Sequence, residues 1–284
     1  MNTLIDGAGL ARALRTRLHE QVARLPRRPG LAVIVVGDNP ASAVYVRNKI
    51  RACEEVGLMS EKIALPADIS EQALLAQIDQ LNARADIDGI LVQLPLPAHI
   101  PVQSTIDHVA VAKDVDGLHT HNLGALLTGS PAVVPCTPAA VLALLDAIEC
   151  PIRGREAVVI GASNVVGKPV ALLLLQRGAT VTVCNSKTTD LAAAARRADI
   201  VIAAAGRPGL ITGAMLKPGS VVIDVGINRL ADGKLAGDVD FASACTVAGR
   251  ITPVPGGVGP MTVAMLVANT VAAAERTLGL PAIP

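Results

Sequence analysis

Aromatic side chains are almost absent from this sequence. Its 284 residues include one tyrosine, Tyr45, one phenylalanine, Phe241, and no tryptophan. Proteins that bind single-stranded nucleic acid stack bases on several aromatic rings, and two isolated rings cannot build such a surface. Charge offers no substitute, because 25 basic side chains balance 24 acidic ones and no global field favours a polyanion or an anionic membrane. We therefore expect no nucleic-acid partner.

Paired cysteines are also missing. The five cysteines lie far apart and none forms a Cys-x-x-Cys pair, so neither a zinc ribbon nor a redox dithiol is indicated. Cys136 is expected to pack in the core. His119 and His121 form a His-x-His pair, but no neighbour completes a ligand set, and we expect a structural loop and no metal. With no charged-then-apolar leader at the N-terminus, these features favour a cytoplasmic protein.

Two uncharged stretches, 120–145 and 256–274, have the length of a membrane span. A spanning helix needs about 20 predominantly apolar residues. Prolines interrupt the first stretch, and proline, threonine and asparagine occur in the second. We therefore expect buried helix and loop, and no membrane partner.

Aliphatic residues are abundant, and hydrophobic residues make up 51% of the chain. Short β-branched runs alternate with segments of helical periodicity in both halves. This alternation predicts an α/β protein with two domains, mostly parallel sheets and right-handed crossovers, and the length fits two domains. We expect strands at 31–36, 63–65, 90–92, 157–160, 180–184, 200–204 and 221–225, and a last long helix at 261–278.

A glycine-bearing turn, GASNVVG at 161–167, follows the strand expected at 157–160. Gly161 permits a tight turn, Gly167 permits close packing of helix on strand, and the N–H groups at the helix start favour an anion. Ser163 replaces the middle glycine of the usual motif, so the spacing alone is also compatible with a turn that holds no ligand. The order of strand, turn, helix and strand favours a dinucleotide site.

The end of the next strand indicates which dinucleotide binds. NAD sites usually place an acid there, to bind the ribose hydroxyls. This chain has Ser186 and Lys187, with no carboxylate until Asp190. A hydroxyl and an ammonium suit a 2′-phosphate, so we favour NADP over NAD; the alternative is an ordinary polar loop.

Longer motifs carry a family resemblance. In order, they read VGDNPASAVYVRNK, VQLPLP, KDVDGLH, PCTP, GASNVVGKP, VIDVGINR and ITPVPGGVGPMT. Over essentially the whole chain these strings resemble the bifunctional methylenetetrahydrofolate dehydrogenase/methenyltetrahydrofolate cyclohydrolase family. The resemblance implies oxidation of 5,10-methylene-tetrahydrofolate to 5,10-methenyl-tetrahydrofolate with NADP, followed by hydrolysis to 10-formyl-tetrahydrofolate.

The resemblance also implies an architecture. It predicts an N-terminal α/β catalytic, folate-binding domain at 1–137, with the C-terminal segment 261–284 packing back on it. A Rossmann-type NADP-binding domain is expected at 138–260. A folate cleft would lie between the two domains, and the protein would be a homodimer.

Site residues follow from the same resemblance. Lys49 matches the catalytic lysine of a Tyr-x-x-x-Lys motif, Tyr45 the tyrosine that stacks on the aminobenzoyl ring, and Gln93 the glutamine that interacts with the lysine. Asp116, the second acid of KDVDG, matches the aspartate that binds the pterin. The other matches are Pro255, Gly256 and Gly257 for the folate cleft and Gly161, Ala162, Ser163, Ser186 and Ile227 for the dinucleotide.

Two features of the sequence bear on these roles. Tyr45 and Lys49 share one helical face, although a surface lysine beside a half-buried tyrosine has the same spacing. Ala162 stands where some family members have an arginine that reaches the extra phosphate, which moves that task to Ser186 and Lys187. Two alternatives remain: a monofunctional NAD(P)-dependent methylenetetrahydrofolate dehydrogenase, and a non-catalytic nucleotide-binding module.

Overall fold

The computed structural model describes residues 4–280, apart from the side chains of residues 40–42. The chain forms two compact units, each with its own sheet. The three-stranded unit contains Arg12–Cys136 and Val263–Pro284, and the five-stranded unit contains Met1–Ala11 and Thr137–Thr262. The segment before Arg12 thus clusters with the five-stranded unit, whereas the domain division expected from the sequence stays a prediction.

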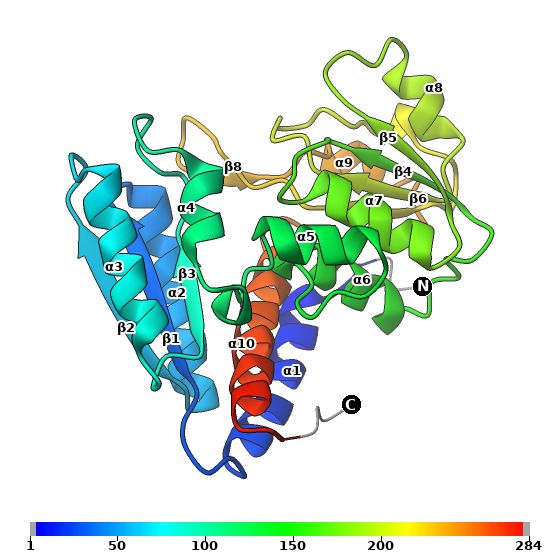
Figure 1. Cartoon of the computed structure of the whole chain (residues 1–284). Helices are drawn as coiled ribbons and strands as arrows, with labels where there is room; N and C mark the ends of the chain where they lie inside the picture. The colour runs from blue at the N-terminus through cyan, green and yellow to red at the C-terminus, as the bar shows by residue number, and fades with distance from the viewer. Residues whose placement is uncertain (1–3, 281–284) are drawn as a thin grey trace. The chain divides into compact units, whose positions relative to one another are not determined.

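The three-stranded unit holds a parallel sheet in the order β2-β1-β3 (Figure 1). The central strand β1 is a continuous apolar run, buried on both faces as parallel strands under helices usually are. The strands are β1 (Gly30–Val36), β2 (Met59–Leu65) and β3 (Gly89–Val92). The helices are α1 (Gly7–Val22, continuing from the other unit), α2 (Pro40–Val56), α3 (Glu71–Ala83), α4 (Val102–His108), α5 (Thr120–Leu127) and the 3-10 turn η1 (Val111–Lys113).

The predicted strands of this unit are confirmed, and one is longer than expected. β2 begins four residues before the predicted position 63. Its first half carries Ser60, Glu61 and Lys62, which are polar, and β2 lies at an edge of the sheet. The sequence therefore predicted only the last three residues of β2, at 63–65, as a strand.

Side chains alternate across β1, and the two faces feed two separate cores. Leu31, Val33 and Val35 pack into a cluster with residues of α1, α2 and α10 (Val258–Thr277). The intervening residues pack with the buried Leu74 and Ile78 of α3. Each fully buried aliphatic side chain contributes roughly 1.5–3 kcal/mol, so these two layers hold β1 and the ends of its neighbours in place.

The five-stranded unit holds a parallel sheet in the order β10-β7-β6-β4-β5. The chain starts at β4, adds β5 on one side, then crosses to the other side for β6 and β7, so the carboxyl ends of β4 and β6 flank a switch point. Its strands are β4 (Glu156–Ile160), β5 (Thr180–Cys184), β6 (Ile200–Ala203), β7 (Val221–Asp224) and β10 (Arg250–Ile251), with a small hairpin of β8 (Asn228–Arg229) and β9 (Leu235–Ala236). Its helices are α6 (Cys136–Ala147), α7 (Gly167–Gln176), α8 (Leu191–Arg196), α9 (Phe241–Ala244) and the 3-10 turn η2 (Gly213–Met215).

Helix α10 is long and apolar enough to cross a membrane by length and composition alone. Its residues Leu266, Val267 and Val271 are buried in the core of the three-stranded unit. This packing accounts for the hydropathy of the helix. Helix α10 lies where the sequence predicted a last long helix.

Candidate active site and dinucleotide-binding turn

Lys49 and Gln93 meet in the three-stranded unit. Tyr45 and Lys49 lie one turn apart on α2 and both are half-buried. The Nζ of Lys49 donates a hydrogen bond to Oε1 of Gln93, which directly follows β3, at 2.9 Å. The Nε2 of Gln93 donates to the carbonyl of Leu94 at 2.7 Å, so the amide oxygen is held towards the amine. The lysine thus has a neutral partner that orients it without adding charge.

Asp116 interacts electrostatically with Lys49. Burial raises the pKa of the Asp116 carboxyl, the positive charge of Lys49 lowers it, and the negative charge of Asp114 raises it. The backbone carbonyl of Asp116 accepts a hydrogen bond from the N–H of Cys136 at 3.3 Å. Lys49 is thus hydrogen-bonded to Gln93 and interacts electrostatically with Asp116, and the functional roles expected for the three residues stay predictions.

The first acid of the same motif, Asp114, has a different use. It is buried, and its oxygens accept hydrogen bonds from the N–H groups of Gly117 at 3.0 Å and His119 at 2.8 Å and from the side-chain amide of Asn122 at 2.8 Å. A carboxylate with three donors stabilises the loop that carries Asp116. Asp114 is therefore a loop-building residue, and Asp116 is the acid placed beside the lysine.

Asn269, which no sequence motif indicated, supports the same segment. Its Nδ2 on α10 donates to the carbonyls of Val115 at 2.9 Å and Val134 at 3.0 Å. The thiol of Cys136 also donates to Val115, and burial raises its pKa well above the ordinary value. Cys136 packs rather than reacts, as expected. The available signal for Asn269 was an amide side chain inside a long apolar helix.

The His-x-His pair caps a helix. The Nδ1 of His119 accepts a hydrogen bond from the N–H of His121 at 2.9 Å, at the start of α5, and its Nε2 bonds the carbonyl of Asp107 at 3.1 Å. Over the part of the chain that the structure describes, no group of three or more His, Cys, Asp and Glu side chains could hold a metal ion. His119 therefore has a structural use.

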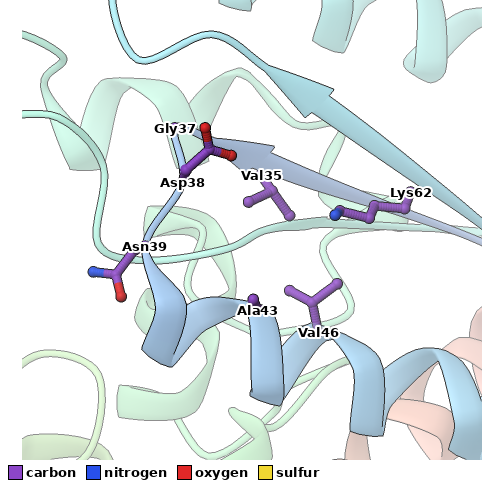
Figure 2. A pocket seen from close by; sticks show the side chains of 7 residues that line it. All are labelled: Val35, Gly37, Asp38, Asn39, Ala43, Val46 and Lys62. Carbon is purple, nitrogen blue, oxygen red and sulfur yellow. The ribbon is translucent and has the colours of Figure 1, made fainter.

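A small hollow lies between α2 and the strands β1 and β2. Figure 2 shows Lys62 on one side of it and Asp38 and Asn39 on the other. Ala43 and Val46, three residues apart, turn one face of α2 towards it, whereas Tyr45 and Lys49 share a different face. None of the predicted site residues lines this hollow, so it is separate from the lysine–glutamine pair.

The turn after β4 in the five-stranded unit requires its glycines. Gly161 has φ +121°, and a Cβ there would lie 2.0 Å from the carbonyl oxygen of Ala204; a Cβ on Gly167 would lie 1.9 Å from the oxygen of Gly161. The Oγ of Ser163 accepts a hydrogen bond from the N–H of Val166 at 3.2 Å at the start of α7. The serine side chain therefore bonds the backbone of the turn just before α7, whose N-cap residue is Val166, and the N–H groups at the start of the helix suit an anion.

The end of β5 fits a phosphorylated ribose. The side-chain oxygen of Asn185 accepts the N–H of Lys187 at 2.8 Å, and Ser186 and Lys187 are both exposed. The carboxylate of Asp190 accepts the N–H of Ala193 at 2.8 Å and caps α8. Because Asp190 is occupied as a cap, it does not replace the acid of an NAD site, and the residues present fit the 2′-phosphate of NADP.

The remaining predicted residues lie on two loops of the five-stranded unit. Ile227 follows β7 and is exposed. The carbonyl of Gly256 accepts a hydrogen bond from the N–H of Ala8 at 2.9 Å. A Cβ on Gly257 would lie 2.6 Å from the carbonyl oxygen of Pro253. Close packing thus explains the glycine at 257, and a folate-lining role for Pro255–Gly257 stays a prediction.

Comparison with protein families gives two matches. The model described as tetrahydrofolate dehydrogenase/cyclohydrolase, catalytic domain, matches residues 5–116. The model described as tetrahydrofolate dehydrogenase/cyclohydrolase, NAD(P)-binding domain, matches residues 135–278. The two matches together cover most of the chain, in the order of its two α/β patterns.

Individual relatives resemble the chain over nearly its full length. It is 62% identical over 279 residues to the bifunctional protein FolD of Bordetella petrii, covering 97% of this chain and 95% of that protein. The crystal structure of the bifunctional enzyme FolD from Campylobacter jejuni is similar with a TM-score of 0.95 and 48% identity, covering 96% of this chain and 99% of that chain. The Trypanosoma brucei N5,N10-methylenetetrahydrofolate dehydrogenase-cyclohydrolase, complexed with NADP cofactor and inhibitor, is similar with a TM-score of 0.94 and 41% identity, covering 97% and 98%.

Proposed function

Because the chain belongs to the tetrahydrofolate dehydrogenase/cyclohydrolase family, we propose that it oxidises 5,10-methylene-tetrahydrofolate with NADP and then hydrolyses the product at one site built around Lys49. The observation that carries this proposal is the 2.9 Å hydrogen bond from Lys49 to Gln93, with Asp116 in electrostatic contact. A neutral acceptor, an amine and a half-buried carboxyl in one place suit a folate ring and a proton transfer.

The oxidation step depends on orientation. Bound NADP supplies the acceptor for the hydride that leaves the methylene bridge. The folate nitrogens stabilise the resulting methenyl cation, so this step requires no proton from the protein. Asp116 accepts hydrogen bonds from the N–H donors of the pterin, and the ring of Tyr45 packs on the aminobenzoyl group. Their task is to hold the reacting carbon in place.

The hydrolysis step requires a base. Water attacks the methenyl carbon and loses a proton as the new C–O bond forms. The amine of Lys49 accepts this proton and returns it to the nitrogen that leaves as one C–N bond breaks. The hydroxyl on the carbon loses the second water proton to solvent as the formyl C=O forms, so the cationic substrate and water give a neutral product and one proton. Gln93 orients the amine through a neutral oxygen, and a cationic substrate repels a positive charge at the same place.

Residues at the carboxyl ends of two strands, β4 and β5, bind different parts of the dinucleotide. The turn from Gly161 to Ser163 and the start of α7 present N–H groups to the pyrophosphate. Ser186 and Lys187 bind the 2′-phosphate, since Ala162 has no charge to offer. Ile227, exposed after β7, contacts the cofactor from the next loop.

The protein is proposed to be a cytoplasmic homodimer. β5 lies at the edge of the five-stranded sheet and carries the exposed Val183, and the neighbouring helix α7 carries the exposed Leu175. An edge strand with apolar side chains pairs readily with a second copy. Light scattering on the purified protein at several concentrations tests the dimer, and a monomer at micromolar concentration would contradict it.

A steady-state assay with both folates and both cofactors tests the function. We expect NADPH formation from 5,10-methylene-tetrahydrofolate and accelerated hydrolysis of 5,10-methenyl-tetrahydrofolate by the same preparation. NADPH formation without accelerated hydrolysis would leave a monofunctional dehydrogenase. Cofactor binding without either reaction would leave a nucleotide-binding module.

A further inference from the structure

Two buried aspartates of the five-stranded unit take no part in the chemistry described so far. Asp238 is completely buried. Its Oδ2 accepts hydrogen bonds from the N–H groups of Ala205 at 2.6 Å and Gly206 at 2.8 Å, and its Oδ1 accepts the side-chain amide of Asn228 at 2.9 Å. One carboxylate therefore holds the loop after β6 and the loop after β7 together.

Asp224, the last residue of β7, extends this network. Its Oδ1 accepts the N–H groups of Gly226 and Asp238, both at 2.9 Å, and its Oδ2 accepts the N–H of Val239 at 3.0 Å. Glycines make room for both acids. A Cβ on Gly226 would lie 2.3 Å from Oδ1 of Asp238, and a Cβ on Gly237 would lie within 1.8 Å of Oδ2 of Asp224.

The network lies at the carboxyl ends of the strands beside the cofactor turn. β6 is hydrogen-bonded to β4, and Gly161 packs so closely on Ala204 that no side chain fits between them. Ile227, the predicted cofactor contact, stands between two residues that the network holds, Gly226 and Asn228. Open α/β sheets bind dinucleotides outside these strand ends, with one mononucleotide on each side of the switch point.

We propose that Asp238 is a positioning residue for the nicotinamide half of the dinucleotide. This inference rests on the proposed cofactor function. The β4 turn and the end of β5 take the phosphates and the adenosine, so the loops after β6 and β7 are left for the other half. Asp238 fixes the backbone of both loops. Burying two carboxyl groups in one network costs desolvation free energy. A requirement of the cofactor for the fixed shape of two loops would explain why the chain keeps both acids.

A purely structural role makes a different prediction. If Asp238 only stabilises the fold, its loss lowers every activity of the preparation in proportion to the unfolded fraction. If it positions the nicotinamide, hydride transfer falls, while the cyclohydrolase reaction, which needs no cofactor, is unchanged. Discrimination between NADP and NAD is also unchanged, because Ser186 and Lys187 act on the other half. The two activities of one enzyme thus provide an internal control.

The experiment compares Asp238→Asn with Asp199→Asn. Asp199 accepts the N–H of Glu156 at 3.1 Å and the Nζ of Lys217 at 2.6 Å, and it precedes β6, at the amino end of the same sheet. It therefore controls for the loss of a bonded carboxylate in the same unit. Measurements on each variant are kcat and KM for both cofactors, cofactor-free hydrolysis of 5,10-methenyl-tetrahydrofolate, and NADPH binding by fluorescence titration.

Asp238→Asn is expected to lower the dehydrogenase kcat roughly tenfold or more, the size of one lost charge-assisted hydrogen bond. NADPH binding should weaken, with the NADP/NAD ratio and the hydrolysis rate within about twofold of wild type, and Asp199→Asn should change none of these quantities by more than that. Equal loss of both activities, an unchanged dehydrogenase or a shifted NADP/NAD ratio would overturn the proposal.

If Asp238→Asn does not fold, Asn228→Ala decides instead. It removes one donor to Oδ1 of Asp238 and leaves the backbone contacts of the carboxylate in place. A selective loss of hydride transfer supports the proposal, and no selective loss overturns it. A wild-type protein that binds NADPH but turns over neither folate would refute the proposed function, and the NADPH titration of the variants would still test Asp238.

Discussion

Two Asp-Val-Asp motifs occur in the chain, one in each unit, at 114–116 and 238–240. In both, the first aspartate is buried and bonded to backbone N–H groups, those of its own loop for Asp114 and those of the loop after β6 for Asp238. The second aspartates differ. Asp116 lies beside the positive charge of Lys49, whereas Asp240 accepts the hydroxyl of Ser243 at 2.6 Å at the start of α9.

The two motifs show how an aspartate that can act on a ligand differs from one that only stabilises the fold. The second aspartate and the two residues before it are the same in both motifs. What differs is the side chain that a nearby helix places beside the second aspartate. Helix α2 carries the lysine near Asp116, and α9 carries the serine bonded to Asp240. A carboxyl whose neighbour is a cation on another helix can bind a charged or polar ligand, and a carboxyl that is hydrogen-bonded to its own helix cannot do so without losing that bond.

Removing the lysine should have the largest effect. Lys49→Met keeps the apolar stem and removes the amine, so hydrolysis of 5,10-methenyl-tetrahydrofolate is expected to fall by at least ~100-fold, the contribution of a general base. Dehydrogenase activity should fall less, through positioning alone. Lys49→Arg should be a poor rescue, because a guanidinium does not release its proton near neutral pH. Hydrolysis is measured with correction for the spontaneous reaction.

Lys62→Met is the matched control for this prediction. Lys62 is an exposed lysine of the same unit, on β2 and away from the lysine–glutamine pair. It should keep both activities. Hydrolysis by Lys49→Met at close to the wild-type rate would mean that Lys49 is not the base and that Asp116 stands beside a structural cation.

The two second aspartates provide the next test. Asp116→Ala should weaken the dehydrogenase and the cyclohydrolase alike, because both substrates carry the pterin ring. A hydrogen bond to a charged group contributes roughly 1.5–3 kcal/mol, which is about one to two orders of magnitude in kcat/KM. Asp240→Ala, the matching change in the other motif, should leave hydrolysis unchanged. Full activity of Asp116→Ala on both folates would abolish the distinction between the two acids.

A new acid at the cofactor site should have a smaller effect. Ser186→Asp places a carboxylate where the 2′-phosphate is expected, and the ratio of kcat/KM for NADP to that for NAD should fall by about tenfold or reverse. Ser186→Ala removes the hydroxyl without adding charge and should change the ratio less. Preference for NAD in the unmodified enzyme would contradict the assignment of this strand end.

The last prediction concerns the pH dependence of folding and affects neither activity. Burial raises the pKa of Asp224 from 3.8 to about 6, against the lowering effect of N–H donors from Val239, Asp238 and Gly226. The folded protein therefore holds this proton more tightly than the unfolded chain. The stabilising contribution is complete below about pH 4 and is lost as pH rises through about 6, a change of about 3 kcal/mol.

Urea unfolding of wild type and Asp224→Asn across this pH range measures that contribution. The difference between their free energies of unfolding should change with pH between about 4 and 6 and be flat above. A difference that is constant with pH would show that Asp224 does not titrate in this range.

The fold and most of the candidate site were predictable from the sequence, for identifiable reasons. Buried parallel strands are continuous apolar runs, so β1 and β4 were clear, whereas β2 was shortened because edge strands carry polar residues. Lys49, Gln93 and Asp116 lie in distinctive motifs. Asp238 and Asn269 were missed because their partners are backbone groups distant in sequence, and no local pattern reports which buried polar residue holds which loop.

The most direct test of the whole account is the fate of the methenyl product. Wild type and Lys49→Met are given 5,10-methylene-tetrahydrofolate and NADP, and NADPH and 5,10-methenyl-tetrahydrofolate are followed together by absorbance. Wild type is expected to pass the product on to 10-formyl-tetrahydrofolate, whereas Lys49→Met is expected to accumulate methenyl-tetrahydrofolate in step with NADPH. Conversion to 10-formyl-tetrahydrofolate by Lys49→Met without that accumulation, beyond the spontaneous rate, would contradict it.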